Sequence, residues 1–188
     1  LPALAARDPA GHKGDFGRVL VLAGSRGMSG AAILCGTAAL RAGAGLVKVA
    51  TAADALPIVA GGNPCYTTAL LPGDSDGRIA RAALPQIIDL CAAHDIIAVG
   101  PGLGQSPDLT ATLIELVDKV VKPMVIDADG LNAFVGHVDR LGGGAAPRII
   151  TPHPGEFARL LHTDIKTVQE QRQALAIEFA NEHELIVV

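Results

Sequence analysis

"GRVLVLAGSRGMSGAA", residues Gly17–Ala32, contains the strongest structural signal in this 188-residue chain. Arg18–Ala23 is dominated by Val and Leu in an unbroken run, which is typical of a strand covered on both faces. Gly24, Gly27 and Gly30 follow, and an alanine-rich helix begins after them. A strand, a glycine turn and a helix N-terminus form an anion-binding device, because free backbone N–H groups and the helix dipole point the same way. The stretch therefore predicts an α/β fold with a ligand site after its first strand.

The same alternation of apolar runs and helical patterns continues along the chain. Further strands are expected at Leu46–Thr51, Asp95–Gly100, Pro123–Asp127, Arg148–Thr151 and Glu184–Val188. Helices are expected at Gly30–Ala42, Asp76–Ala93, Pro107–Val121, Gly130–Val135 and from Pro154 onward to Glu182. Repeated strand–helix units predict a doubly wound, mostly parallel sheet with helices on both faces, in a single domain spanning residues 1–188.

Composition excludes several classes of protein. The chain is 49% apolar and 18% charged, so a packed interior is expected rather than disorder. A net charge of −4 without a Lys- or Arg-rich block argues against a nucleic-acid partner. The uncharged Gly- and Ala-rich run Gly27–Leu40 is too short to span a bilayer, and no signal-peptide pattern opens the chain, so no membrane partner is expected. Cys35, Cys65 and Cys91 form no Cys-x-x-Cys pair, which favours buried, reduced thiols in the cytoplasm.

Glycine-rich and polar loops follow four of the expected strands. They are AGSRGMSG at 23–30, GPGLGQ at 100–105, DADGLN at 127–132 and TPHPGE at 151–156. Ligands of open parallel sheets bind at the carboxyl ends of the strands, so these loops predict one site. Ser25 and Arg26 follow Gly24, which breaks the Rossmann fingerprint, and no Walker-type Lys follows Gly30. Turn geometry and close helix packing are the alternative interpretation of these glycines.

The acidic residues of the third loop allow two interpretations. Asp127 leaves a buried strand and is a candidate for contacting a metal–nucleotide assembly, with helix capping as the alternative. Asp129 is expected to be a helix N-cap. In the second loop, Gly102 and Gly104 permit either an anion nest or close approach of a flat ring to the backbone.

Two prolines fix the turn around His153 in the fourth loop, so the direction of its imidazole is set by a rigid backbone. Glu156 lies in the first turn of the helix that follows. It is expected either to interact with the helix dipole or to contact Mg²⁺ through water. The remaining histidines carry no partner pattern and are expected at the surface: His94, His137, His162 and His183.

Taken together, these stretches resemble the ADP/ATP-dependent NAD(P)HX dehydratases of the ribokinase-like superfamily. The resemblance runs in order through HKGDFGRVLVLAGSRGMSGAA, AALRAGAGLVKVAT, VGPGLGQ, VIDADGLNAF and ITPHPGEFARLL. It implies a carbon–oxygen lyase of cofactor repair, which dehydrates (6S)-NADHX or NADPHX to NADH or NADPH with Mg²⁺ and ADP or ATP. With ADP the products are AMP and phosphate. The implied chemistry is phosphoryl transfer to the C6 hydroxyl of the hydrate, followed by loss of phosphate.

The resemblance also implies roles for individual residues. Ala31, Gly102 and His153 match positions that contact the hydrated dinucleotide. Glu156 stands where the superfamily has the Glu of its Asn-x-x-Glu signature, which implies a contact with hydrated Mg²⁺. Asp127 is the second residue expected to reach Mg²⁺ through water.

The chain departs from the family pattern at its end. The family continues with a Lys-Gly segment and a Gly-[ST]-Gly-Asp motif that carries the catalytic Asp, and neither occurs before Val188. Glu184–Val188 has the pattern of a central strand, so a domain truncated at its C-terminal nucleotide-binding part is expected, inactive as an isolated fragment. A terminal edge strand is the alternative.

Several questions stay open at this level. The choice between ADP and ATP, the choice between NADHX and NADPHX, and an epimerase domain fused upstream are not decided by the residues. Homo-oligomers, often tetramers, are implied by the family. A ribokinase-like small-molecule kinase and a non-catalytic nucleotide-binding fragment are the alternative functions.

Overall fold

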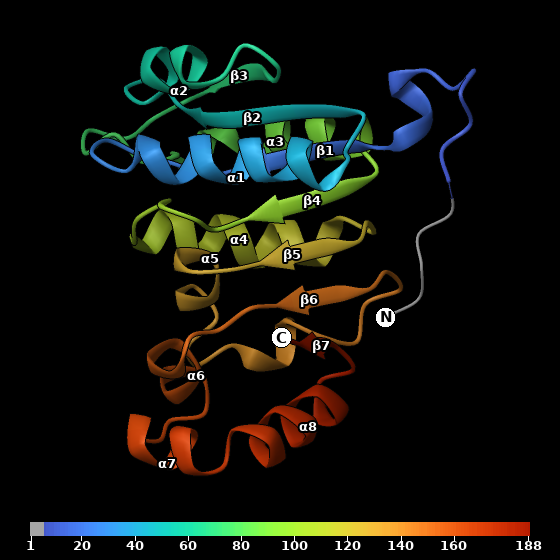
Figure 1. Cartoon of the computed structure of the whole chain (residues 1–188). Helices are drawn as coiled ribbons and strands as arrows, with labels where there is room; N and C mark the ends of the chain where they lie inside the picture. The colour runs from blue at the N-terminus through green and yellow to red at the C-terminus, as the bar shows by residue number, and fades with distance from the viewer. Residues whose placement is uncertain (1–5) are drawn as a thin grey trace.

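A seven-stranded sheet runs through the centre of the computed structural model, which describes residues 6–188 (Figure 1). The order is β3-β2-β1-β4-β5-β6-β7, and every neighbouring pair is parallel. The strands are β1 (Arg18–Leu22), β2 (Leu46–Ala52), β3 (Thr67–Leu71), β4 (Ile96–Val99), β5 (Met124–Ile126), β6 (Arg148–Ile150) and β7 (Ile186–Val187). The strand order turns back at β1, so β1 and β4 flank the switch point at which ligands bind in doubly wound sheets. The predicted fold class is confirmed.

Helices cover both faces of this sheet. The α-helices are α1 (Ser29–Ala42), α2 (Leu56–Gly62), α3 (Leu84–Ala92), α4 (Pro107–Lys119), α5 (Asp129–Asn132), α6 (Pro154–Leu160), α7 (Ile165–Glu170) and α8 (Arg172–Glu182). Short 3-10 turns occupy η1 (Lys13–Phe16), η2 (Arg81–Ala83) and η3 (Val138–Arg140). Among the described residues, no helix is long and apolar enough to span a membrane.

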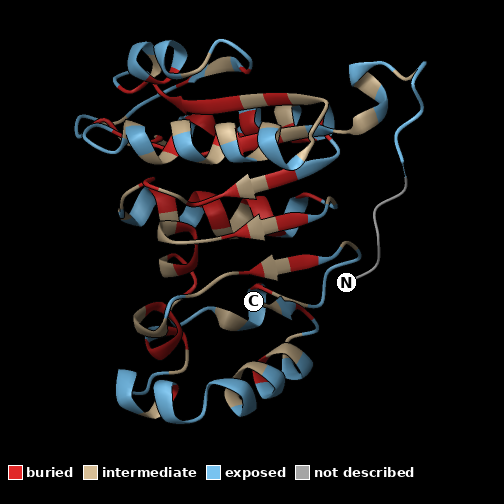
Figure 2. Cartoon of the chain, in the orientation of Figure 1, coloured by how far each residue is buried: buried red, intermediate tan, exposed pale blue. Residues whose placement is uncertain are grey.

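The two faces of β1 show how the layers form. Leu20 and Leu22 point into the larger core, which also contains buried residues of α3 and α4. Val21 points to the opposite face and packs with Ala32 of α1. In Figure 1, α1 lies in front of the sheet and α3 behind it. Figure 2 shows the strands as the most buried elements, with the outer sides of the helices exposed.

The sheet face that α1 covers at β1 is less completely covered at β4–β7. Ala98, Val125, Ile149 and Ile186 occupy one register row across β4–β7, on the side of Val21. The first three are partly buried and Ile186 is 49% exposed. The far side of the same strands is buried in the larger core.

Two elements were not predicted, and two predicted helices have different bounds. The strand β3 and the helix α2 were missed, because Thr67–Leu71 is only partly buried and carries a weak apolar signal. The expected helix at Asp76–Ala93 begins only at Leu84, because Gly77 has a φ of +76° and the chain forms a tight loop there. The expected long helix from Pro154 to Glu182 is three helices, broken after Leu160 and again at Gln171.

Further expectations concerned single residues and the final strand. The final strand lies at the sheet edge and pairs with β6 alone within the described residues. Only Cys91 is buried, whereas Cys35 is partly buried and Cys65 is exposed. His94, expected at the surface, is 7% exposed.

Candidate active site

The four predicted loops lie on one rim of the sheet. They follow β1, β4, β5 and β6, which are neighbours in the strand order, and parallel strands end at the same edge. In Figure 1 this rim is at the left, where the strand arrows point. The sequence prediction that these loops converge is therefore confirmed by the topology.

The loops after β1 and β4 are in direct contact. The Gly24 N–H donates to the carbonyl oxygen of Pro101 at 2.9 Å, and the Ser25 hydroxyl donates to the carbonyl oxygen of Gly102 at 2.8 Å. Gly102 has a φ of +67°, and a Cβ added to it would lie 2.9 Å from the Cβ of Ala31. The structure thus brings Ala31 and Gly102 together. Gly102 has no side chain because the two loops approach too closely to leave room for one.

Other glycines of the first loop face open space. A Cβ added to Gly27 or Gly30 would meet no atom within 4 Å. The N-terminus of α1 beside them has no side-chain cap from Met28 and no acidic residue in its first turn. The N-terminus of a helix whose N–H groups are uncapped attracts anions. This part of the rim can hold an anionic ligand against the backbone.

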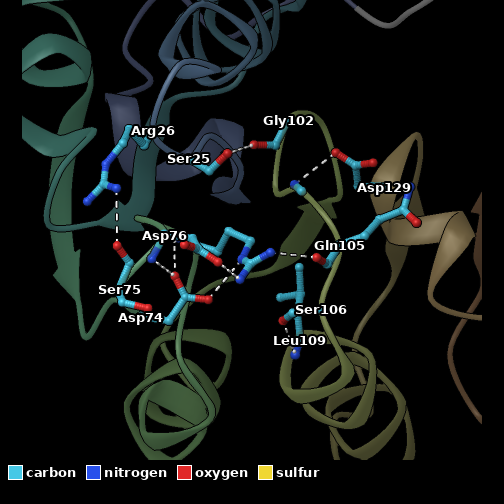
Figure 3. Close-up of polar contacts among 12 residues, drawn as sticks. Ser25, Arg26, Asp74, Ser75, Asp76, Gly102, Gln105, Ser106, Leu109 and Asp129 are labelled. Carbon is cyan, nitrogen blue, oxygen red and sulfur yellow. Dashed lines mark hydrogen bonds and ion pairs between the residues drawn. The ribbon is translucent and has the colours of Figure 1, made fainter.

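Arg78, which the sequence analysis did not single out, connects the GPGLGQ loop to the GDSDGR segment at 73–78. Arg78 donates from Nε to Oδ2 of Asp74 at 2.8 Å and from Nη1 to the carbonyl oxygen of Gln105 at 2.8 Å. On the other side of that loop, the Gly104 N–H donates to Oδ2 of Asp129 at 2.9 Å. The contacts around Asp74, Gln105 and Asp129 can be followed in Figure 3. The adjacent residues Gly104 and Gln105 of the GPGLGQ loop are thus each held by a side chain, Asp129 on one side and Arg78 on the other.

Electrostatics reinforces this arrangement. The backbone N–H and the guanidinium of Arg78 lower the pKa of Asp74 from its ordinary value. The hydrogen bond to Asp74 raises the pKa of Arg78 in turn. The prediction that Asp129 caps a helix was wrong: Asp129 is the first residue of α5, Ala128 is the N-cap residue, and the carboxylate instead accepts from Gly104.

His153 and Glu156 form a capping box at the start of α6. The His153 Nδ1 accepts from the N–H groups of Gly155 and Glu156 at 3.0 and 3.3 Å, so the ring proton lies on Nε2. The Glu156 Oε2 accepts from the His153 N–H at 2.9 Å, and its Oε1 lies 3.2 Å from Nε2. The imidazole is 63% exposed while the carboxylate is 8% exposed. The capping box therefore fixes the direction of the His153 ring, as expected. This ring and Gly102 are not adjacent, because β5 and its loop lie between them.

The residues expected near Mg²⁺ can be tested against this geometry. Within residues 6–188, no group of three or more His, Cys, Asp and Glu side chains is placed to hold a metal ion. Oε2 of Glu156 accepts one hydrogen bond and Oε1 lies near Nε2 of His153, so both oxygens have capacity for a further partner. The Asp127 carboxylate follows β5 and accepts no hydrogen bond from the described residues, and its charge contributes, after burial, to the raised pKa of Cys35. These groups fit a water-mediated contact with a nucleotide-bound Mg²⁺, and they do not form a protein-only cage.

Comparison with known proteins places this geometry in context. A family model described as NAD(P)H-hydrate dehydratase matches residues 19–188. The chain is 40% identical over 185 residues to the bifunctional NAD(P)H-hydrate repair enzyme Nnr of Moorella thermoacetica, over 98% of this chain and 35% of that protein. It is 34% identical over 188 residues to the ADP-dependent (S)-NAD(P)H-hydrate dehydratase of Bacillus subtilis, over 98% of this chain and 62% of that protein.

Solved structures agree with these sequence matches. The crystal structure of the ADP/ATP-dependent NAD(P)H-hydrate dehydratase from Bacillus subtilis, co-crystallized with ATP/Mg²⁺, superposes with a TM-score of 0.75 and 28% identity. That match covers 98% of this chain and 61% of the solved one. The chain therefore spans about three fifths of the length of the Bacillus subtilis relative and about a third of the Moorella relative. Since the family model covers nearly the whole chain, this protein belongs to the NAD(P)H-hydrate dehydratase family.

Proposed function

We propose that this chain supplies the dinucleotide-binding rim of an enzyme that dehydrates (6S)-NADHX or NADPHX to NADH or NADPH with ADP or ATP. The observation that carries the proposal is the contact between Ala31 and Gly102 beside the uncapped N-terminus of α1. Together the two loops would offer a glycine-lined backbone surface, against which a flat ring can lie, with an anion-attracting end. A dinucleotide needs both, because it has flat rings and a negatively charged pyrophosphate.

His153 and Ala31 would contact the hydrated dinucleotide from different parts of the rim. The exposed imidazole offers its Nε2 edge, and the capping box holds the ring in one tautomer and direction. A polar group held in place costs little ordering entropy when a ligand binds. This supports a binding role for His153, and Glu156 would then act on it as a positioning residue.

Glu156 and Asp127 would reach Mg²⁺ through water, and the nucleotide phosphates would provide the inner ligands. Bound with the nucleotide, Mg²⁺ neutralises charge during phosphoryl transfer. Within this chain, the rim residues would orient the C6 hydroxyl of the hydrate and exclude water. The catalytic Asp that the family resemblance implies has no counterpart before Val188, so we assign no catalytic residue here. Assembly into homo-oligomers and a cytoplasmic location stay predictions.

An activity assay tests the proposal. NADPHX is incubated with Mg²⁺ and either ADP or ATP, and recovery of the reduced-nicotinamide absorbance is followed. The assay uses this chain and, wherever the gene continues past Val188, its full product. Nucleotide-dependent recovery by the folded full product is expected. Absence of recovery, with turnover of another hydroxyl-bearing substrate instead, would favour a ribokinase-like kinase.

The binding role of His153 needs a matched pair of variants. His153→Asn keeps a side-chain acceptor at the N-cap position of α6, whereas His153→Ala removes it. If the ring binds the dinucleotide, both variants weaken NADPHX binding more than ADP binding. Equal weakening of both ligands, or loss confined to His153→Ala, would leave only the capping role. His137→Ala, at another exposed histidine, serves as the control.

A further inference from the structure

A cavity of about 310 Å³ lies at the edge of the sheet opposite the candidate active site. Its lining comes from the beginnings of β1, β2 and β3 and from the turn between α3 and β4. In Figure 1 this edge is at the right, where β1 and β2 begin. The volume is at the lower end of the range of small-ligand pockets. Nothing in the proposed dehydratase chemistry uses this cavity.

Two cationic side chains and one histidine line it. Arg18 is the first residue of β1, Lys48 is in β2 and His94 precedes β4. None of the three side chains forms an ion pair with a carboxylate in the part of the chain that the structure describes. Asp95, the neighbouring acid, accepts from the backbone N–H of Arg18 at 2.8 Å. Arg18 and Lys48 are cations at a concave surface, and no carboxylate pairs with their side chains among the described residues, so they create a local positive potential that favours anions.

His94 adds a polar atom to this wall. The residue is 7% exposed, and its Nδ1 lies 2.6 Å from the carbonyl oxygen of Leu90. A carbonyl oxygen can only accept, so Nδ1 carries a proton and Nε2 of the neutral ring is an acceptor. No described residue donates to Nε2. This nitrogen is accessible, because the one buried side-chain nitrogen or oxygen without a partner among the described residues is Nη1 of Arg81. It can therefore accept a hydrogen bond from a ligand that brings a donor.

These two features select among anions. Arg18 and Lys48 favour a negatively charged group with several oxygens, for which guanidinium and ammonium are the usual partners. The acceptor at His94 favours an anion that also carries an O–H, which hydrogen phosphate has and sulfate lacks. Thr67, the first residue of β3, adds a hydroxyl to the same wall. The apolar remainder of the lining and the volume leave room for a short organic group beside the phosphate.

We propose that this cavity binds a phosphate group, either inorganic phosphate or the head of a small phosphate monoester, at a site separate from the dinucleotide rim. The phosphate oxygens accept from Arg18 and Lys48, and a phosphate O–H donates to Nε2 of His94. This assignment does not depend on the proposed dehydratase activity.

Calorimetric titrations of the folded chain test the proposal. Inorganic phosphate, glycerol phosphate and sulfate are compared at constant ionic strength near neutral pH. Saturable binding of one phosphate species per chain, tighter than that of sulfate, is expected. Tighter binding of glycerol phosphate than of inorganic phosphate would identify a monoester as the natural ligand, and the reverse order would identify the free ion.

Variants locate the site. Lys48→Gln is expected to weaken phosphate binding by about tenfold, the effect of losing one charge-assisted hydrogen bond. Lys166→Gln removes an equally large charge from an exposed position on α7 and is expected to leave it unchanged. His94→Phe keeps the ring volume and is expected to abolish the preference for phosphate over sulfate, with thermal unfolding as the check on its fold. Equal effects of Lys48→Gln and Lys166→Gln, or no saturable binding by the unmodified chain, would overturn the proposal.

Discussion

Gly102→Ala tests how tightly the two loops of the rim fit together. Gly102 has a φ of +67°, and adopting the left-handed region costs an L-residue roughly 1–2 kcal/mol. The added Cβ would lie 2.9 Å from the Cβ of Ala31, 3.0 Å from the Cβ of Met28 and 3.1 Å from the Met28 carbonyl oxygen. Overpacking of this kind typically costs about 1–3 kcal/mol. The free energy of unfolding should therefore fall by about 2–5 kcal/mol in total.

Gly27→Ala is the matched control. Gly27 lies in the first loop, has a φ of +81° and has no atom within 4 Å of an added Cβ. It should lose only the backbone contribution, roughly 1–2 kcal/mol. Urea unfolding of the two variants measures both losses, with an unchanged denaturant slope as the check on two-state behaviour. If Gly102→Ala cost no more than Gly27→Ala, the loops would not be packed as described, and the glycine would serve backbone conformation alone.

Three further predictions concern the surroundings of the rim. Arg78→Lys keeps the charge beside Asp74 but removes the fork that also reaches the GPGLGQ loop, so hydrogen exchange of the Gly104 amide should accelerate by about tenfold. The carboxylate of Asp74 has a lowered pKa, so its stabilising contribution is present above its unfolded-state pKa of about 3.9 and is lost as pH falls through the folded value. The difference in unfolding free energy between the unmodified chain and Asp74→Asn should accordingly shrink in acid. Burial raises the pKa of Cys91 to about 12, so iodoacetamide near neutral pH should modify the exposed Cys65 rapidly and Cys91 only after unfolding.

Each of these has a contrary outcome. Arg140→Lys, which alters a similar pair with Asp118 on α4, is the control for Arg78→Lys and should leave exchange at the rim unchanged. Equal exchange in the two variants would mean that Arg78 does not hold the loop. A pH-independent difference for Asp74→Asn, or alkylation of Cys91 at the rate of Cys65, would contradict the corresponding assignment.

The sheet was predictable because its central strands carry an unambiguous pattern. β1, β4 and β6 are covered on one or both faces, so their apolar runs stand out against polar and glycine-rich neighbours. β3 is an edge strand with two threonines and little burial, and its run therefore lacks that contrast. The helical pattern at Asp76–Ala93 was misleading because Asp74 and Gly77 form a loop whose hydrogen bonds compete with a helix.

The candidate site was predictable at its glycines and not at its supporting side chains. The GPGLGQ and TPHPGE loops could be predicted because their Gly and Pro residues directly follow an apolar run that predicts a strand. Arg78 lies between strands β3 and β4, outside every rim loop, and its contact with Gln105 depends on a long-range approach that spacing does not encode. The GDSDGR stretch at 73–78 carried a signal of turn geometry, since Asp and Gly at these spacings favour a tight loop.

The most direct test of the central claim is an NMR titration of the ¹⁵N-labelled chain with NADPHX. If the rim binds the hydrated dinucleotide, the amide resonances of Ala31, Gly102 and Gly104 shift together and saturably, while those of Arg18 and Lys48 at the opposite edge do not. Gly102→Ala should weaken the titration more than Gly27→Ala. Saturable shifts confined to residues away from the loops after β1 and β4, or no shifts in the folded chain, would contradict the claim that this rim recognises the damaged cofactor.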